Sequence, residues 1–461
     1  MARRDLTQGG IVRGIVAFAL PLLGASVVQQ LYSTVDMLFV GNVVGTQAVA
    51  ALGVGSLLIT LMMGLFSGMS VAANVRVANF AGVGDAAELR AAIRASMRIG
   101  IMGGLALAAL GEALADPFIA AMEIPKESAA DALGYLRFAV AATLPIAIFN
   151  MCSGALRGLG DSSTPFVAQA AGGVANVGAN WFLLCVFGLG IEGCALATLA
   201  SNGLAASIAV CVLVRRAREC GVSGGGAGQR GVSSGGALRW MLGFGAPIAV
   251  QTVAITLSNV VVQHQVDILG VVSVAAFAVY LKVELPIYYT ILAIGQATTT
   301  FVAQNYGARL HERCAKGSHA CQALCLALAL ATSGLMLAIL PYAFGIFDWS
   351  DDVISVGVAF ARTTFPFYAA YAVLEVQADA MRGFGHSLAP ALVVLLNTCV
   401  VRVAIVYASV GCGMGMQGIA ASYPLTWTSS AVMLVVVRMI LKRGRERRSR
   451  LGGSGSRGQS L

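Results

Sequence analysis

Long apolar runs separated by short polar stretches make up most of this chain. Each run extends over about 20 residues without the strict alternation of a membrane-barrel strand, and a helix of that length crosses the hydrocarbon core of a bilayer. We therefore predict an all-α polytopic membrane protein with twelve transmembrane helices. The predicted spans lie near residues 15–40, 47–73, 91–115, 132–154, 164–188, 191–214, 239–263, 272–301, 318–343, 353–378, 388–410 and 416–441.

A stretch rich in Gly and Ser, CGVSGGGAGQRGVSSGG (220–236), interrupts the apolar pattern near the middle of the chain. Such a composition is typical of a flexible connection between domains. The predicted organisation has four parts: an N-terminal six-helix bundle (1–214), a basic cytoplasmic linker (215–238), a C-terminal six-helix bundle (239–441) and a basic cytoplasmic tail (442–461).

The two halves repeat each other. GALRGLGDSSTP (154–165) matches DAMRGFGHSLAP (379–390) at an offset of 225, and GIEGCALAT (190–198) matches GMQGIAASY (415–423) at the same offset. Because each copy has an even number of spans, the two bundles are predicted to be related by a pseudo-two-fold axis along the membrane normal. This arrangement is typical of carriers that open a central site to each side of the membrane in turn.

Composition and charge support a membrane location. Hydrophobic residues make up 58% of the chain and charged residues only 11%, which excludes a soluble globular protein of this size. Much of the net charge of +9 lies in the linker and in the tail KRGRERRSR (442–450). Because Lys and Arg cluster on the cytoplasmic side of membrane proteins, we expect both termini inside a bacterial plasma membrane, and we favour the membrane surface over nucleic acid as the partner of the tail.

Four motifs in this order resemble the multidrug and toxic compound extrusion (MATE) family. They are VDMLFVGNVVGTQAVAALG (35–53), LRGLGDSSTP (156–165), QNYGA (304–308) and MRGFGHSLAP (381–390). The resemblance covers residues 10 to 440 approximately. It implies a two-bundle carrier that exports amphipathic, often cationic small molecules in exchange for H⁺ or Na⁺. We further expect a monomer that needs no cofactor.

The seventh predicted span narrows the resemblance. Norfloxacin exporters of the family carry a glutamate there, whereas PIAVQTVAITLSNVV (247–261) contains no acid. The chain is therefore closer to the DinF-like branch, in which an aspartate of the first helix carries the proton.

Asp36 is the first candidate ion-coupling residue, because a charge in the middle of a bilayer costs at least ~2.5–3.5 kcal/mol. Gln29, Tyr32 and Ser33 lie on or near its helix face, as expected where a helix lines a wet cavity, and they are candidate substrate-binding residues. The alternative is an aspartate near the outer headgroups. Asp267, in VDIL, imitates this motif but is out of register with the repeat.

Asn176 and Asn180 are the other candidate ion-coupling residues. They are four residues apart and share one helix face, and amides in hydrocarbon need polar partners. We expect them to face Asp36, although helix packing alone also explains amides there.

The second half offers four more candidate substrate-binding residues. Glu284, Tyr288, Glu375 and Arg402 lie inside predicted spans, where ionisable groups need partners. Glu284 is interpreted either as a site for a cationic substrate or as a structural charge that pairs with Arg402. Asp379 is expected to pair with Arg382.

Two alternatives to a multidrug carrier remain. A lipid or lipid-linked oligosaccharide flippase of the same fold needs a more cationic cavity than Lys282 and Arg402 provide. A membrane-embedded enzyme needs a paired catalytic constellation, but the four histidines are scattered. The sequence contains no ATPase motif, so an ion gradient is the expected energy source.

Overall fold

The computed structural model describes residues 5–121, 126–219 and 234–452, and these are helical apart from short connections, with no strand among them. Most of the predicted linker and the last residues of the predicted tail lie outside this described part. The chain forms two compact units. Unit 1 comprises Met1–Leu257, Leu292–Ala320 and Gly383–Gly385, and unit 2 comprises Ser258–Ile291, Cys321–Arg382 and His386–Leu461.

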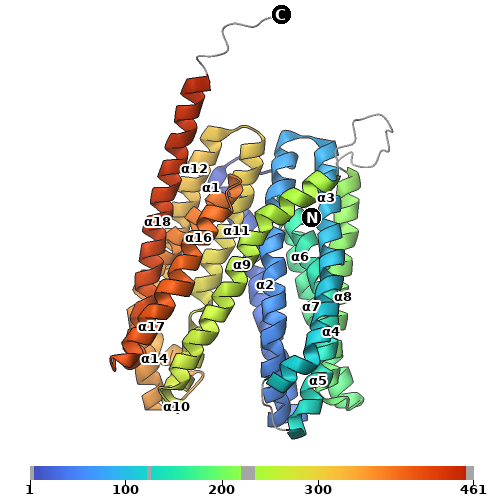
Figure 1. Ribbon diagram of the computed structural model, residues 1–461, viewed down its shortest axis with the longest axis vertical. Coiled ribbons are helices and arrows are strands. Elements are labelled where there is room, and N and C mark those ends of the chain that lie inside the picture. The colour runs from blue at the N-terminus through green and yellow to red at the C-terminus, as the bar shows by residue number, and fades with distance from the viewer. Residues whose placement is uncertain (1–4, 122–125, 220–233, 453–461) are drawn as a thin grey trace, which may run out of the picture. The chain divides into compact units, whose positions relative to one another are not determined.

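The helices follow the order of the predicted spans (Figure 1). The first part of the chain, up to the end of α9, has the elements α1 (Ile11–Phe39), η1 (Val40–Val44), α2 (Thr46–Val83), α3 (Ala86–Arg98), η2 (Ile99–Gly103), α4 (Gly104–Ala121), α5 (Lys126–Ala141), α6 (Thr143–Gly158), α7 (Ser163–Asn180), η3 (Trp181–Val186), α8 (Gly190–Ala217) and α9 (Ser234–Asp267).

The remaining elements continue from residue 271. They are α10 (Val271–Val283), α11 (Leu285–Gly307), α12 (His311–Ala338), α13 (Leu340–Gly345), α14 (Asp351–Thr364), η5 (Phe365–Phe367), α15 (Tyr368–Gly383), α16 (Leu388–Leu395), η6 (Leu396–Val401), α17 (Arg402–Gly411) and α18 (Gly415–Gly452). In unit 2, α14 and α17 both pack against α18.

Ten helical stretches of the described residues are long and apolar enough to cross a membrane, and the bent pair α10–α11 adds an eleventh. The predicted span near 164–188, which comprises α7 and η3, is outside this set. Its helix carries Gln169, Asn176 and Asn180, so the polar residues that make it a candidate site also lower its hydropathy.

The duplication is preserved in the backbone. Residues with left-handed φ angles occur in five pairs at an offset of 225, and each pair marks an equivalent turn between helices. The pairs are Gly45 and Gly270, Gly84 and Arg309, Gly160 and Gly385, Gly188 and Gly413, and Gly190 and Gly415. Arg309 is the one described residue other than glycine with such an angle, at 59°. The turn geometry is therefore kept even where the glycine is lost.

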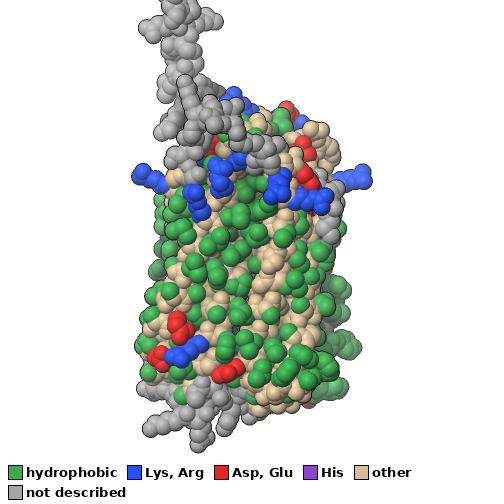
Figure 2. Space-filling model, turned by 90° about the vertical axis from the view of Figure 1, so that its right-hand side faces the viewer, with side chains coloured by type: hydrophobic (Ala, Val, Ile, Leu, Met, Phe, Trp, Pro, Cys, Tyr) green, Lys and Arg blue, Asp and Glu red, His purple; other side chains and the backbone are tan. Residues whose placement is uncertain are grey.

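Packing within unit 1 brings together helices that carry candidate residues. Helix α7 packs against both α1 and α8, and α2 packs against α6. Small residues allow these approaches: a Cβ at Gly172 of α7 would lie 3.1 Å from the carbonyl oxygen of Ser201 in α8. On the surface that Figure 2 shows, apolar side chains form a broad belt, with Lys and Arg gathered towards one end and a few charged groups at the other, as expected for a membrane-spanning protein.

Candidate functional site

Asp36 of α1 is half-buried and contacts two neighbouring helices of unit 1. The amide nitrogen Nδ2 of Asn180 in α7 donates a hydrogen bond to its Oδ1, and the hydroxyl of Thr198 in α8 donates to its Oδ2 at 3.4 Å. The expected facing of Asn180 and Asp36 is thus confirmed as geometry. Among the described residues no Lys, Arg or His forms an ion pair with Asp36, so its negative charge is met by neutral donors alone.

The two asparagines form a short chain behind the carboxylate. Asn180 Nδ2 also donates to Asn176 Oδ1 at 3.1 Å, and both residues are fully buried. The Oδ1 atom of Asn180 is buried and has no hydrogen-bond partner within the described part of the chain. Rotation of this amide by half a turn would exchange donor and acceptor, so Asn180 can bond either an ionised or a protonated carboxyl group.

The polar stripe of α1 divides between two surroundings. The hydroxyl of Tyr32 accepts a hydrogen bond from Asn202 in α8 at 3.1 Å, close to Asp36. Ser33 donates to the carbonyl of Gln29 at 3.2 Å, and both side chains are exposed. The structure therefore joins Tyr32 to the site, and the polar contacts described for Ser33 and Gln29 do not include Asp36.

Sequence reasoning missed Thr198 and Asn202. These residues are four apart in the sixth apolar run, the same spacing as Asn176 and Asn180 in the fifth run. The repeated spacing was the available signal for these residues. A polar pair four residues apart lies on one face of its helix, and the polar faces of two consecutive helices can pack against each other.

Glu284 lies at a break in unit 2. It separates α10 from α11, whose axes differ by 44°, and the hydroxyl of Tyr368 donates a hydrogen bond to its Oε2 at 2.5 Å. Tyr368 itself follows the 3₁₀ turn η5 between α14 and α15. The carboxylate thus joins two interrupted spans, and interrupted helices in carriers commonly accompany polar sites.

Arg402 is buried near Glu284 but bonds elsewhere. Its Nε and Nη2 donate to Thr426 Oγ1 at 3.3 and 3.2 Å, and its guanidinium lies 4.4 Å from the ring centroid of Tyr423. The guanidinium still interacts electrostatically with Glu284, although no ion pair within 4.0 Å joins the two groups.

The other candidates of unit 2 occupy separate surroundings. Tyr288 stacks on Tyr371 with ring centroids 5.9 Å apart. Asp379 and Arg382 form a buried ion pair at 2.7 Å, as the sequence predicts. Glu375, one turn before this pair, interacts electrostatically with both of its members.

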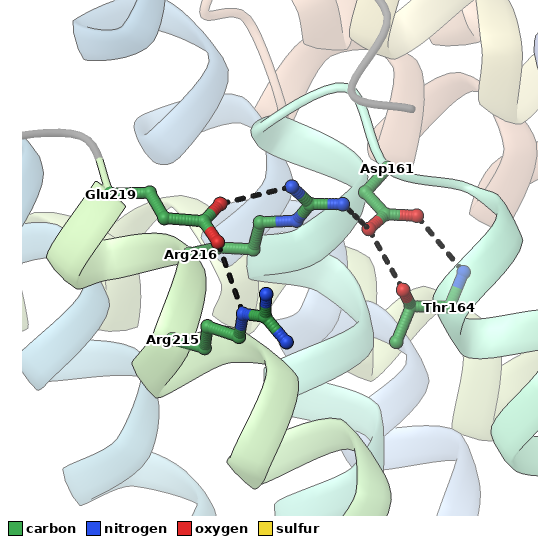
Figure 3. Close-up of polar contacts among 5 residues, drawn as sticks. All are labelled: Asp161, Thr164, Arg215, Arg216 and Glu219. Carbon is green, nitrogen blue, oxygen red and sulfur yellow. Dashed lines mark hydrogen bonds and ion pairs between the residues drawn. The ribbon is translucent and has the colours of Figure 1, made fainter. Parts of the chain in front are cut away.

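A charged cluster lies where α7 begins and α8 ends in unit 1 (Figure 3). The buried carboxylate of Asp161 accepts hydrogen bonds from the amide and hydroxyl of Thr164 at 2.9 and 2.8 Å, which caps α7, and Arg216 lies 3.6 Å from it. Glu219 accepts from Arg216 and Arg215 at 3.0 and 3.1 Å. The hydrogen bonds from Arg216 and Arg215 hold the pKa of the exposed Glu219 below its ordinary value.

Fold and site together define a class of protein, namely a multi-pass helical membrane protein whose chain contains the same sequence repeat twice. The chain belongs to the MatE family, the multidrug and toxic compound extrusion proteins, whose sequence pattern matches residues 21–182 and again 247–408. The two matches begin and end 226 residues apart (247 − 21 and 408 − 182), so the family unit occurs twice.

Known proteins agree with this assignment. The probable multidrug resistance protein YpnP of Bacillus subtilis is 24% identical over 312 residues, which are 67% of this chain and 68% of the relative. The probable multidrug resistance protein NorM of Thermotoga maritima is 23% identical over 408 residues, 87% of this chain and 86% of the relative. A crystal structure of a MATE protein in a bent conformation matches with a TM-score of 0.88 and 20% identity, over 96% of this chain and 98% of that chain. The predicted fold of twelve helices in two bundles is therefore confirmed.

Proposed function

We propose that the protein is a secondary-active multidrug antiporter of the DinF-like branch that exports amphipathic, often cationic compounds in exchange for H⁺ or Na⁺. It works as a monomer in the bacterial plasma membrane, with both termini in the cytoplasm. Alternating access between the two bundles carries the substrate across.

One observation carries the proposal. Asp36 lies in an apolar span, and the described residues supply it with hydrogen-bond donors but with no cationic partner. A carboxylate in such surroundings is stabilised by a cation from outside, either a proton on its oxygen or a metal cation among the oxygens of Asp36, Asn176 and Thr198. Binding and release of that cation would bias the N-terminal bundle between two conformations and so alter its affinity for substrate.

Asn180 is the partner that makes both forms of Asp36 acceptable. Its amide donates to the ionised carboxylate through Nδ2, and after rotation its Oδ1, which has no partner in the present arrangement, would accept from the protonated carboxyl group. A second acidic residue at this position could not serve in both ways without a proton of its own.

The test is an exchange assay in proteoliposomes that follows internal pH after a cationic dye is added. Asp36→Asn is expected to abolish dye-driven proton movement while the protein still folds. Collapsing the proton and sodium gradients in turn identifies the coupling ion.

Asp267→Asn is the matched control, because Asp267 stands in a similar local sequence but is exposed at the end of α9, where Gln263 donates to it at 2.8 Å. This variant should exchange at the rate of the wild type. Normal exchange in folded Asp36→Asn protein would disprove coupling through Asp36.

A further inference from the structure

The repeated segments ANFAG (78–82) and AQNYG (303–307) cross each other within unit 1. A Cβ added at Gly82 would lie far inside van der Waals contact with the carbonyl oxygen of Gln304, and a Cβ added at Gly307 would meet the carbonyl oxygen of Asn79 in the same way. The two contacts are equivalent, because 79 + 225 = 304 and 82 + 225 = 307. Helices α2 and α11 therefore touch backbone to backbone around a local two-fold axis.

The contact extends one turn along both helices, where the pairing of side chains is one residue out of step with the repeat. Asn74 Nδ2 donates to Thr300 Oγ1 at 2.9 Å, and Thr300 donates back to Asn74 Oδ1 at 3.2 Å. Gly158 would place a Cβ 2.7 Å from the carbonyl oxygen of Asn74, and Gly383, 225 residues later, would place one 2.9 Å from that of Thr299. Each copy thus presents the same small surface to the crossing.

The N-terminal segment is fastened to the same crossing. The amide of Leu6 donates to Gln304 Oε1 at 3.2 Å, and Asn305 Nδ2 donates to the carbonyl of Leu6 at 3.1 Å. Arg313 donates to the carbonyls of Gln8 and Gly9, both at 2.9 Å. The side chain of Leu6 is buried, with 2% exposure.

Gln304 connects the second copy to the first at two points. Besides accepting from Leu6, it donates through Nε2 to the carbonyl of Gly158 at 2.8 Å. Separation of α2 and α11 would break these side-chain bonds but no bond within either helix, and the freed groups of Asn74, Thr300 and Gln304 are polar enough to face water. The contact between the two helices consists of close backbone approach and interhelical hydrogen bonds, and its polar groups can bind water once the helices part.

We propose that the crossing at Gly82 and Gly307, latched by Gln304 and the segment of residues 5–9, is the gate that closes one end of the transport path. The proposal rests on the alternating-access function given above, because such a carrier must part its two copies at one end and then at the other. Gly82 and Gly307 are positioning residues: their lack of a side chain lets the closed state form.

Native cysteines provide the test. Cys314 lies in α12 directly after Arg313, is 1% exposed and donates through its thiol to the carbonyl of Val302 in α11 at 3.7 Å. Purified full-length protein is treated with N-ethylmaleimide, and mass spectrometry of its peptides gives a labelling rate for each cysteine. Buried Cys152 in the core of unit 1 reports general unfolding, and exposed Cys412 reports the reactivity of the reagent.

The double variant Gly82→Ala/Gly307→Ala should label at Cys314 roughly fivefold faster than the wild type or more, with Cys152 unchanged, because the labelling rate follows the population of the open state. Gly243→Ala is the matched control, since a Cβ there meets nothing within 4 Å. Unchanged labelling of Cys314 in the double variant would overturn the proposal, and so would a parallel rise at Cys152, which indicates unfolding without a gate.

Gln304→Leu tests the latch without a steric clash and covers the case in which the double variant does not fold. It should raise labelling of Cys314 about twofold by removing the bonds to Leu6 and Gly158; no rise would overturn the latch. The readout needs no ion gradient. If labelling of Cys314 rises but Asp36→Asn still exchanges protons, the gate proposal is supported and the coupling proposal fails. If labelling of Cys314 is unchanged but Asp36→Asn no longer exchanges protons, only the gate proposal fails.

Discussion

The acidic clusters of the two units differ although the turns around them are duplicated. In unit 1, Asp36 has the amide of Asn180 and the hydroxyl of Thr198 as donors. Asp36 follows Pro21 by 15 residues, and in unit 2 the residue 15 positions after Pro247 is Val262, which is buried. Thr198 corresponds to Tyr423 at the offset of 225. The acid of unit 2, Glu284, has come from a different helix. Duplication has therefore preserved turn geometry while the polar chemistry of the two copies has diverged.

The divergence has an electrostatic consequence. Glu284 interacts with the guanidinium of Arg402, which is part of the protein, whereas Asp36 is met by neutral donors among the described residues. A carboxylate near a fixed guanidinium depends less on an exchangeable cation than a carboxylate whose partners are all neutral. Under the proposed antiport function, this difference favours Asp36 over Glu284 as the coupling residue.

The largest expected effect is on proton exchange, and it distinguishes Asp36 from Glu284. Glu284→Gln should keep dye-driven proton exchange, because the amide still accepts a hydrogen bond from Tyr368, whereas Asp36→Asn should lose it entirely. Both variants are measured in the same proteoliposomes at equal protein density. Loss of exchange in folded Glu284→Gln protein would show that coupling is shared between the units.

Stability should respond most strongly in unit 2. Tyr368→Phe removes the hydroxyl that donates to the half-buried Glu284, and loss of a hydrogen bond to a carboxylate costs ~1.5–3 kcal/mol. We expect a lower apparent Tm in detergent, measured by tryptophan fluorescence during heating.

Tyr342→Phe is the control for this change, because Tyr342 is 80% exposed and loses the same hydroxyl. It should leave the apparent Tm unaltered. An equal Tm for Tyr368→Phe and the wild type would mean that the Tyr368–Glu284 bond does not hold the two interrupted spans together.

The sequence predicted the fold and part of the first site. Apolar runs located the spans, and the i, i+4 spacing of Asn176 and Asn180 correctly placed an amide opposite Asp36, because helix periodicity fixes which residues share a face. The sequence did not predict Thr198 as a donor or Thr426 as the partner of Arg402. Contacts between helices depend on how each helix is rotated about its axis and on the direction of each side chain, and a single sequence does not determine either. The bend at Glu284 was not predicted either, although the nearby Pro286 is a residue that commonly bends a helix.

A smaller effect tests another difference between the copies. Asp161 stands where the second copy has His386, and it caps α7 through Thr164. Asp161→Ala should lower the apparent Tm, since loss of a helix cap costs ~0.5–2 kcal/mol and the buried carboxylate also faces Arg216. Asp85→Ala removes the exposed cap of α3, where water can replace the lost bonds, so its effect should be smaller. A larger loss at Asp85 would contradict this explanation.

The smallest effect concerns the second acid beside Arg216. Glu219 is exposed, and its lowered pKa means that its bonds to Arg216 and Arg215 stabilise the folded state above its ordinary pKa and are lost as the pH falls through the lowered value. Solvent screens such an exposed pair, so Glu219→Gln should leave the apparent Tm at neutral pH and physiological salt unchanged. Melting curves of this variant and of Asp161→Ala at pH 7 therefore compare an exposed with a buried partner of one guanidinium. If Glu219→Gln lowered the apparent Tm as much as Asp161→Ala does, burial would not explain the difference between the two acids.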